Sequence, residues 1–189
     1  DVSQGRTTDG SSSISMFTLP TPGYSNATNL AAQQLLMDNV RITEVMYNPA
    51  GGNSAPEYIE IRNISETQTV DLQGITFEFI KLDAFGAPLP ILLGPGAFTV
   101  ITSLSQGAFN AVYPAAPYGG TYSGRLDNGG ERVRMEIGGY QLGILDFSYA
   151  DSWYPQTDGG GAALEIVNAQ APRLSWNEKP SWRATAPNP

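Results

Sequence analysis

Carboxylates are the side chains of this chain best suited to acid–base chemistry, because the sequence contains neither histidine nor cysteine. This composition excludes imidazole and thiol relays and the common zinc sites. Five acids lie near predicted strand ends and loops: Glu57, Glu60, Asp146, Asp151 and Asp158. A glycosidase needs two carboxyl groups that face each other across its substrate, but Glu57 and Glu60 are three residues apart in an alternating run and point to opposite faces. We therefore expect no catalysis, and we expect these acids to lie on a solvated surface.

Asp151 and Asp158 are the candidates for a metal site. Ca²⁺ prefers hard oxygen ligands from loops, and both residues lie in one predicted loop. The chain has no Asp-x-Asp-x-Asp-Gly motif, and Asp158-Gly159 is also typical of a turn in which the aspartate bonds its own backbone. A calcium site at these two residues is the one cofactor hypothesis, and otherwise we expect no cofactor.

Four aromatic residues in loop-rich sequence form a candidate ligand site: Tyr118, Tyr122, Trp153 and Tyr154. Exposed aromatic rings stack on flat ligands such as sugars. The alternative role is packing in the core or anchoring of loops. Trp176 and Trp182 are expected to have that second role and to pin the carboxy-terminal segment.

The chain is acidic and long enough for one domain with an appendage. It has 189 residues and a formal net charge of −8 at pH 7, which repels phosphate backbones. No stretch approaches the ~20 apolar residues that a membrane span requires. We therefore expect neither a nucleic-acid partner nor a membrane span.

Short runs of alternating apolar and polar residues, separated by turn residues, predict an all-β fold. The clearest run is 57–63, in which Ile59 and Ile61 share one face. Asn128-Gly129 predicts a tight hairpin turn within 126–137. Further strands are expected at 40–47, 70–80, 98–102, 142–149 and 163–167, and short helices at 30–37 and 103–113.

The expected core follows from the apolar positions of these runs. It consists of Ile42, Val45, Ile59, Ile61, Phe77, Val100, Val133, Met135, Leu145, Phe147, Leu164 and Ile166. Seven strands at this spacing predict a β-sandwich.

Five of these segments together resemble the lamin tail domain in its bacterial form: 42–49, 57–63, 70–75, 126–133 and 158–165. The resemblance covers about residues 40 to 183 and implies an immunoglobulin-like antiparallel β-sandwich. It also implies a module used for association in nuclear lamins, and in bacteria an accessory domain of large exported or surface proteins. It supplies no catalytic residues.

Residues 1–28 resemble the end of a preceding copy of the same domain, because Thr8-Asp9-Gly10 echoes Thr157-Asp158-Gly159. We therefore expect two parts. Residues 1–38 would be the terminal strand of a preceding domain plus a linker, and residues 39–189 would be the lamin-tail-like sandwich.

The resulting hypothesis is a non-catalytic binding or structural module of a larger exported or cell-surface protein. Its expected partners are neighbouring domains of the same parent chain, other proteins or surface glycans, and its expected location is extracellular or at the cell surface. The alternative is a carbohydrate-binding accessory domain of an extracellular hydrolase.

Overall fold

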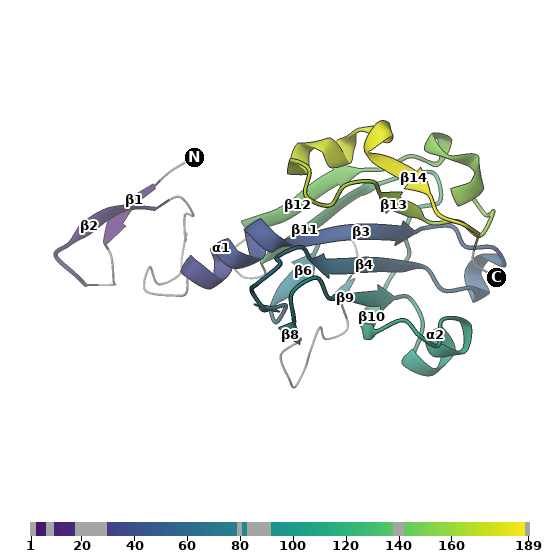
Figure 1. Ribbon diagram of the computed structural model, residues 1–189, viewed down its shortest axis with the longest axis horizontal. Helices are drawn as coiled ribbons and strands as arrows, with labels where there is room; N and C mark the ends of the chain where they lie inside the picture. The colour runs from purple at the N-terminus through teal and green to yellow at the C-terminus, as the bar shows by residue number, and fades with distance from the viewer. Residues whose placement is uncertain are drawn as a thin grey trace.

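Two β-sheets face each other across one apolar core (Figure 1). The computed structural model describes residues 3–6, 10–17, 30–78, 81–82, 92–137 and 142–187. In these residues the larger sheet has the order β14 (Trp182–Ala184), β13 (Leu164–Ile166), β3 (Val40–Met46), β4 (Tyr58–Asn63), β9 (Phe98–Thr102), β10 (Tyr118–Ser123) and β7 (Lys81–Leu82). The smaller sheet has the order β12 (Leu142–Ser148), β11 (Arg132–Ile137) and β6 (Ile75–Phe77).

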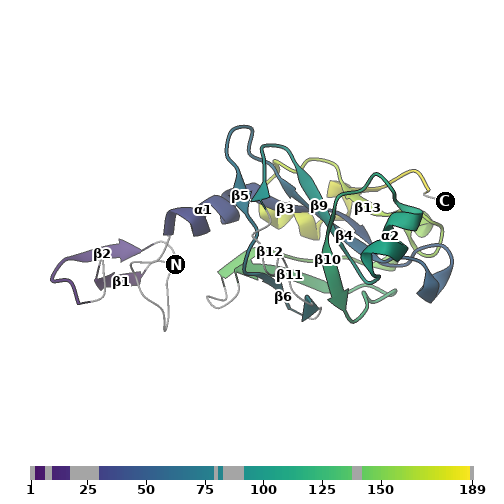
Figure 2. The same ribbon diagram turned by 90° about the horizontal axis from the view of Figure 1, so that it is seen from below.

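Shorter elements surround the two sheets. They are the pair β5 (Val70–Asp71) and β8 (Leu92–Leu93), the helices α1 (Leu30–Asn39) and α2 (Gln106–Val112), and the 3₁₀ turns η1 (Gly52–Ser54), η2 (Asp151–Trp153), η3 (Pro155–Thr157), η4 (Arg173–Asn177) and η5 (Lys179–Ser181). A hairpin of β1 (Ser3–Arg6) and β2 (Ile14–Phe17) lies beyond the amino-terminal end of α1 in both Figure 1 and Figure 2. None of the helices in the described residues is long and apolar enough to cross a membrane.

The all-β sandwich is confirmed, and alternation builds its core as predicted. In β4, Ile59 and Ile61 are fully buried between the sheets, while Arg62 is exposed. All twelve predicted core residues are buried. Val100 differs in its surroundings, because it packs with Phe109 in a second cluster beneath α2.

One pairing departs from the antiparallel pattern among the described strands. β10 runs parallel to β9, because α2 lies in the connection between them and returns the chain to the same end of the sheet. The local pattern does not predict β10, because Gly119-Gly120 in its middle is typical of a loop rather than a strand.

The turn at Asn128-Gly129 is present, but the predicted hairpin over 126–137 is wrong. The amide of Gly130 donates to the carbonyl of Asp127 at 3.1 Å and closes the turn. β10 before the turn belongs to the larger sheet, while β11 after it belongs to the smaller sheet. The segment is therefore an arch between the sheets.

Gly130 fixes how closely this arch approaches the smaller sheet. Its φ of +109° favours glycine, and a Cβ atom at this position would collide with the carbonyl of Tyr149. The Tyr149 hydroxyl in turn donates to the carbonyl of Asp127 at 2.8 Å. Both contacts tie the arch to the end of β12.

Glu57 holds the other side of the arch, and the expectation that this acid is solvated is wrong. Only 3% of the residue is exposed. Its carboxylate accepts a hydrogen bond from the amide of Leu126 at 3.0 Å and forms an ion pair with Arg125 at 3.4 Å. Its carbonyl accepts the amide of Ser103 at 3.1 Å and the hydroxyl of Thr102 at 2.9 Å. Burial raises the pKa of Glu57, and the Leu126 bond opposes that shift.

Asn63 performs the equivalent task at the opposite end of β4. The residue is fully buried, and its side-chain amide donates to the carbonyls of Gln68, Leu93 and Gly94 at 2.7, 3.0 and 3.0 Å. Its Oδ1 accepts the amide of Ser65 at 3.0 Å. One side chain thus joins β4 to the following loop and to β8.

The two tryptophans pin the carboxy-terminal segment, as predicted. The indole of Trp176 donates to the carbonyl of Ile42 at 2.9 Å, and that of Trp182 donates to the carbonyl of Trp176 at 2.8 Å. Both rings are buried. The segment from η4 to β14 is therefore part of the sandwich.

η4 also covers the free edge of β12. The Arg173 guanidinium donates to the carbonyl of Ile144 at 3.1 Å, and the side-chain carbonyl of Asn177 accepts the amide of Ser148 at 3.1 Å. These side chains thus form hydrogen bonds with backbone groups of β12 that an additional strand could otherwise pair with.

α1 belongs to the sandwich, whereas the described hairpin β1–β2 forms hydrogen bonds within itself. Leu36 is buried in the main core. The guanidinium of Arg41 closes the end of α1 by donating to the carbonyls of Met37 and Asp38 at 3.0 and 2.9 Å. The boundary expected after residue 38 would divide α1 from the sheet on which it packs.

Deletion of residues 1–29 should leave the free energy of unfolding nearly unchanged, because α1 and both sheets remain. Deletion of residues 1–37 should lower that free energy by about 2 kcal/mol or more, because it removes Leu36 from the core. Urea denaturation of both truncated chains and the full chain measures the difference. If deletion of residues 1–29 already lowered the free energy of unfolding by about 2 kcal/mol or more, the amino-terminal hairpin would be integral to the domain.

Candidate functional site

The four predicted aromatic ligand residues lie in two separate places. Tyr118 and Tyr122 belong to β10. Tyr122 is only 1% exposed and packs in the main core, so it offers no open ring face. Tyr118 is half-buried, with its ring centroid 6.3 Å from that of Phe109.

Trp153 and Tyr154 pack instead against the carboxy-terminal segment. The Trp153 ring centroid lies 6.5 Å from that of Trp182. The Tyr154 hydroxyl donates to the carbonyls of Trp182 and Lys179 at 2.7 and 3.1 Å, and the ammonium of Lys179 lies 5.2 Å from its ring centroid. These two residues anchor a loop in this structure.

Asp151 bonds within its own turn, whereas Asp158 bonds to the segment that follows β3. Asp151 accepts the amide of Ser152 at 2.6 Å, and Asp158 accepts the side-chain amide of Asn48 at 2.6 Å. Across the described residues, no three acidic side chains lie close enough together to hold a metal ion.

The most unusual grouping is a row of three glutamates on the outer face of the larger sheet, the face turned away from the smaller sheet. Glu44 on β3 lies opposite Glu165 on β13 and opposite Glu60 on β4. Like charges directly opposite each other in a sheet are destabilising. Among the described residues, Glu165 is the member of the row that has a cation within 4 Å, because Arg183 on β14 donates two hydrogen bonds to it at 2.8 and 3.0 Å.

Hydroxyl groups of the chain itself hold the other two carboxylates. Tyr58 donates to Glu44 at 2.5 Å, and Thr43 donates to Glu60 at 2.6 Å. The pairing of β3 with β4 is irregular between Ile42 and Glu44, so Thr43 is an extra residue in a β-bulge. The bulge places Glu44, rather than Thr43, opposite Glu60.

This setting keeps Glu44 partly protonated at neutral pH. The pKa of Glu44 is raised to about 7, mainly by burial; the charges of Glu60 and Glu165 act in the same direction, and the Tyr58 hydrogen bond opposes them. Burial likewise raises the pKa of Glu60, while the Thr43 hydrogen bond and the charge of Arg62 lower it.

An aromatic cluster adjoins the acidic row on the same face. Phe109 and Tyr113 lie one helical turn apart at the end of α2, and Tyr58 packs edge-on against Tyr113 with ring centroids 5.4 Å apart. Burial raises the pKa of Tyr113, and the charge of Glu44 raises it further. The carboxylate and the phenol therefore share one local environment.

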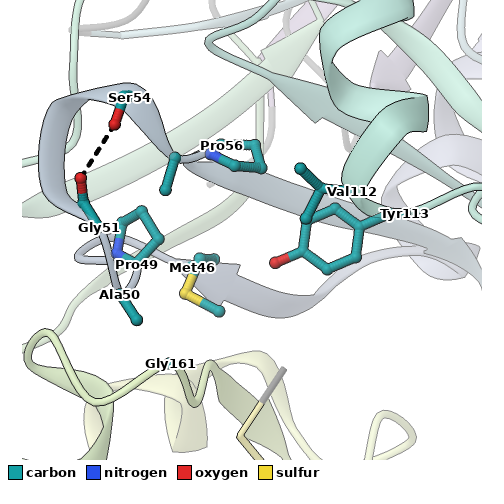
Figure 3. A pocket seen from close by; sticks show the side chains of 10 residues that line it. Met46, Pro49, Ala50, Gly51, Ser54, Pro56, Val112, Tyr113 and Gly161 are labelled. Carbon is teal, nitrogen blue, oxygen red and sulfur yellow. Dashed lines mark hydrogen bonds between the residues drawn. The ribbon is translucent and has the colours of Figure 1, made fainter. Parts of the chain in front are cut away.

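Beside this cluster the surface is hollowed by about 260 Å³ (Figure 3). Its lining is Met46, Pro49, Ala50, Gly51, Ser54, Ala55, Pro56, Val112, Tyr113 and Gly161. Figure 3 shows the Tyr113 hydroxyl and the Met46 side chain turned toward the same space. These contributions come from β3, the loop around η1, the end of α2 and the loop before β13.

We call Glu44, Glu60, Met46, Tyr58 and Tyr113, with the adjoining hollow, the outer-face site. It combines two carboxylates, two aromatic rings and a recess lined mostly by apolar residues. Of these residues, the sequence pattern indicated only Glu60 as a candidate and did not join it to the others. Alternation indicated which residues face outward, but the pairing of Glu44 with Glu60 depends on the bulge at Thr43, which has no clear sequence signal.

Glu44→Gln should make the protein more stable at pH 8 but not at pH 5. A carboxyl group whose pKa is higher in the folded than in the unfolded chain binds more protons when folded, so its contribution to stability falls as the pH rises from about 4.3 through about 7. The variant should gain about 1–3 kcal/mol in the free energy of unfolding at pH 8 relative to the parent.

Urea denaturation between pH 5 and pH 8 measures this effect. Other carboxyls with raised pKa values contribute to the parent's own profile, so the difference between variant and parent is the relevant quantity. Glu66→Gln, at an exposed turn residue, is the charge-matched control. A pH-independent difference for Glu44→Gln would contradict the assignment.

Comparison with known proteins identifies the domain. A family model described as the Lamin Tail Domain matches residues 37–143, from the end of α1 into β12. No curated protein and no solved structure matches the chain. The family has an immunoglobulin-like fold, in agreement with the two facing sheets. Because the match spans more than half of the chain, the chain belongs to the lamin tail domain family.

Proposed function

We propose that this chain is a non-catalytic association module that binds another protein through the outer-face site. The observation that carries the proposal is the site itself: a recess lined mostly by apolar residues and a pair of carboxylates on the same sheet face, which Figure 1 shows open between β13 and β4. Protein interfaces commonly combine an apolar, aromatic centre with a polar rim.

The composition of the recess favours a protein side chain as its occupant. Its lining is mostly methionine, proline, alanine, valine and tyrosine, and about 260 Å³ suits one or two side chains rather than a large cofactor. Glu44 is connected to the recess through Tyr58, which donates to it and packs on Tyr113, and the glutamates would select a partner by charge.

Family membership supports the absence of catalysis. Lamin tail domains are a non-catalytic, immunoglobulin-like family. Within the site, Glu44 and Glu60 already accept hydrogen bonds from Tyr58 and Thr43, an arrangement that holds the two carboxylates in place.

We further propose that the parent is a larger exported or cell-surface protein. The bacterial form that this chain resembles is an accessory domain of such proteins. The hairpin β1–β2, which lies apart from the sandwich (Figure 2), is in keeping with a neighbouring domain upstream. A two-stranded hairpin alone is at best marginally stable in water.

A photo-crosslinking amino acid at position 112 of the intact parent protein tests the association. Val112 lines the recess and is 39% exposed. Leu174, 83% exposed on η4 beside β12, is the matched control position. We expect protein adducts from position 112 in the native host that are absent from position 174, and the captured protein, once purified, should bind the isolated chain.

Ala50→Gln is a second test, because it enlarges an exposed side chain at the recess and should obstruct the partner. It should reduce both the adducts and the binding of the purified partner. Equal labelling from positions 112 and 174, or no protein adduct from position 112, would contradict the proposal. Binding to glycans that is lost on Trp153→Ala would favour the carbohydrate-binding alternative instead.

A further inference from the structure

We infer that the outer-face site accepts a lysine or arginine side chain from the partner, with its cation at Glu44 and Glu60 and its aliphatic stem against Met46 and Tyr113. The inference rests on the proposed function, because it names the chemistry of the partner at the same site.

A pair of opposing carboxylates with little cationic compensation is the first reason, because among the described residues Arg62 lowers the pKa of Glu60 but no cation lowers that of Glu44. Glu44 and Glu60 lie directly opposite each other on neighbouring strands. In the part of the chain that the structure describes, neither has a cation within 4 Å, whereas their neighbour Glu165 is paired with Arg183. A bound cation would relieve the repulsion between the two glutamates, and it would be attracted by both.

The adjoining surface suits the rest of such a side chain. Lysine and arginine lay an apolar stem along apolar surface while keeping the charged group at a polar position. Met46 and Tyr58 are buried in the cluster next to the glutamates, and Tyr113 packs on Tyr58 at the edge of the recess. The aromatic rings add cation–π attraction.

The donor and acceptor counts also favour an organic cation. An ammonium group has three donors, and two carboxylates flanked by hydroxyl groups can accept them. Ca²⁺ needs six to eight oxygen ligands. The described residues contain no group of three acidic side chains placed to hold a metal ion.

Binding of a cation here would depend on pH near neutrality. The titratable and charged groups around the pair are Tyr58 and Arg62 on β4, Glu165 on β13 with its partner Arg183 on β14, and Tyr113 after α2. Because burial raises the pKa of Glu44 to about 7, its ionised fraction rises about tenfold between pH 6 and pH 8. Affinity for a cation should rise by up to about the same factor.

Titration of the ¹⁵N-labelled chain with a short peptide, followed by NMR, tests the inference. The probe is acetyl-Ala-Leu-Lys-Ala-amide, and the control replaces its lysine with the uncharged norleucine. We expect saturable shift changes at the amides of residues 44–46, 58–60 and 113, with the control at least about tenfold weaker. Affinity for the lysine peptide should increase from pH 6 to pH 8.

Single substitutions test whether the charges of Glu44 and Glu60 are needed for binding of the lysine peptide. Glu44→Gln and Glu60→Gln should each weaken binding of the lysine peptide, and Glu44→Gln should remove most of its pH dependence. Glu66→Gln, which removes an exposed carboxylate from the turn after β4, should leave affinity unchanged. A general loss of fold would be visible as shift changes throughout the spectrum.

Two results would overturn the inference. Equal binding of the lysine and norleucine peptides at the outer face would refute the role of the cation while leaving an association surface in place. Absence of outer-face shifts with the lysine peptide at millimolar concentrations would also refute it. Whether the proposed function also fails is decided separately, by comparing the protein adducts formed from positions 112 and 174.

Discussion

The buried carboxylate of Glu57 holds the two sheets together at one end of the central strand β4. It binds the arch that carries the chain from the larger sheet to the smaller one, through the amide of Leu126. Asn63 anchors the other end of the same strand with four side-chain hydrogen bonds. Buried polar groups without partners cost about 1–3 kcal/mol each, so these bonds strongly favour a single position for β4 and its neighbours.

The outer-face site depends on that fixed position. Glu60 and Tyr58 project from β4, and the bulge at Thr43 sets the register that brings Glu44 opposite Glu60. Two glutamates side by side weaken a sheet, and the charge of Glu60 adds to the effect of burial, which is the main cause of the raised pKa of Glu44.

Much of the sandwich could be predicted from local pattern, whereas the site could not. Alternation in β4 correctly assigned Ile59 and Ile61 to the core, because burial on one face of a strand has a period of two residues. The same reasoning could not show that Val100 packs beneath α2, or that the turn at 127–130 joins different sheets. Those features depend on which strands become neighbours, and no local signal encodes that choice.

Native-state hydrogen exchange at the amide of Leu126 tests most directly whether Glu57 fixes the arch. This residue lies outside any strand, and its amide donates to the Glu57 carboxylate. If that bond joins the sheets, the amide should exchange only through global unfolding, as slowly as the most protected amides of β3 and β4. Exchange as fast as that of an unstructured peptide would show that the arch opens independently, and would contradict the central role assigned to Glu57.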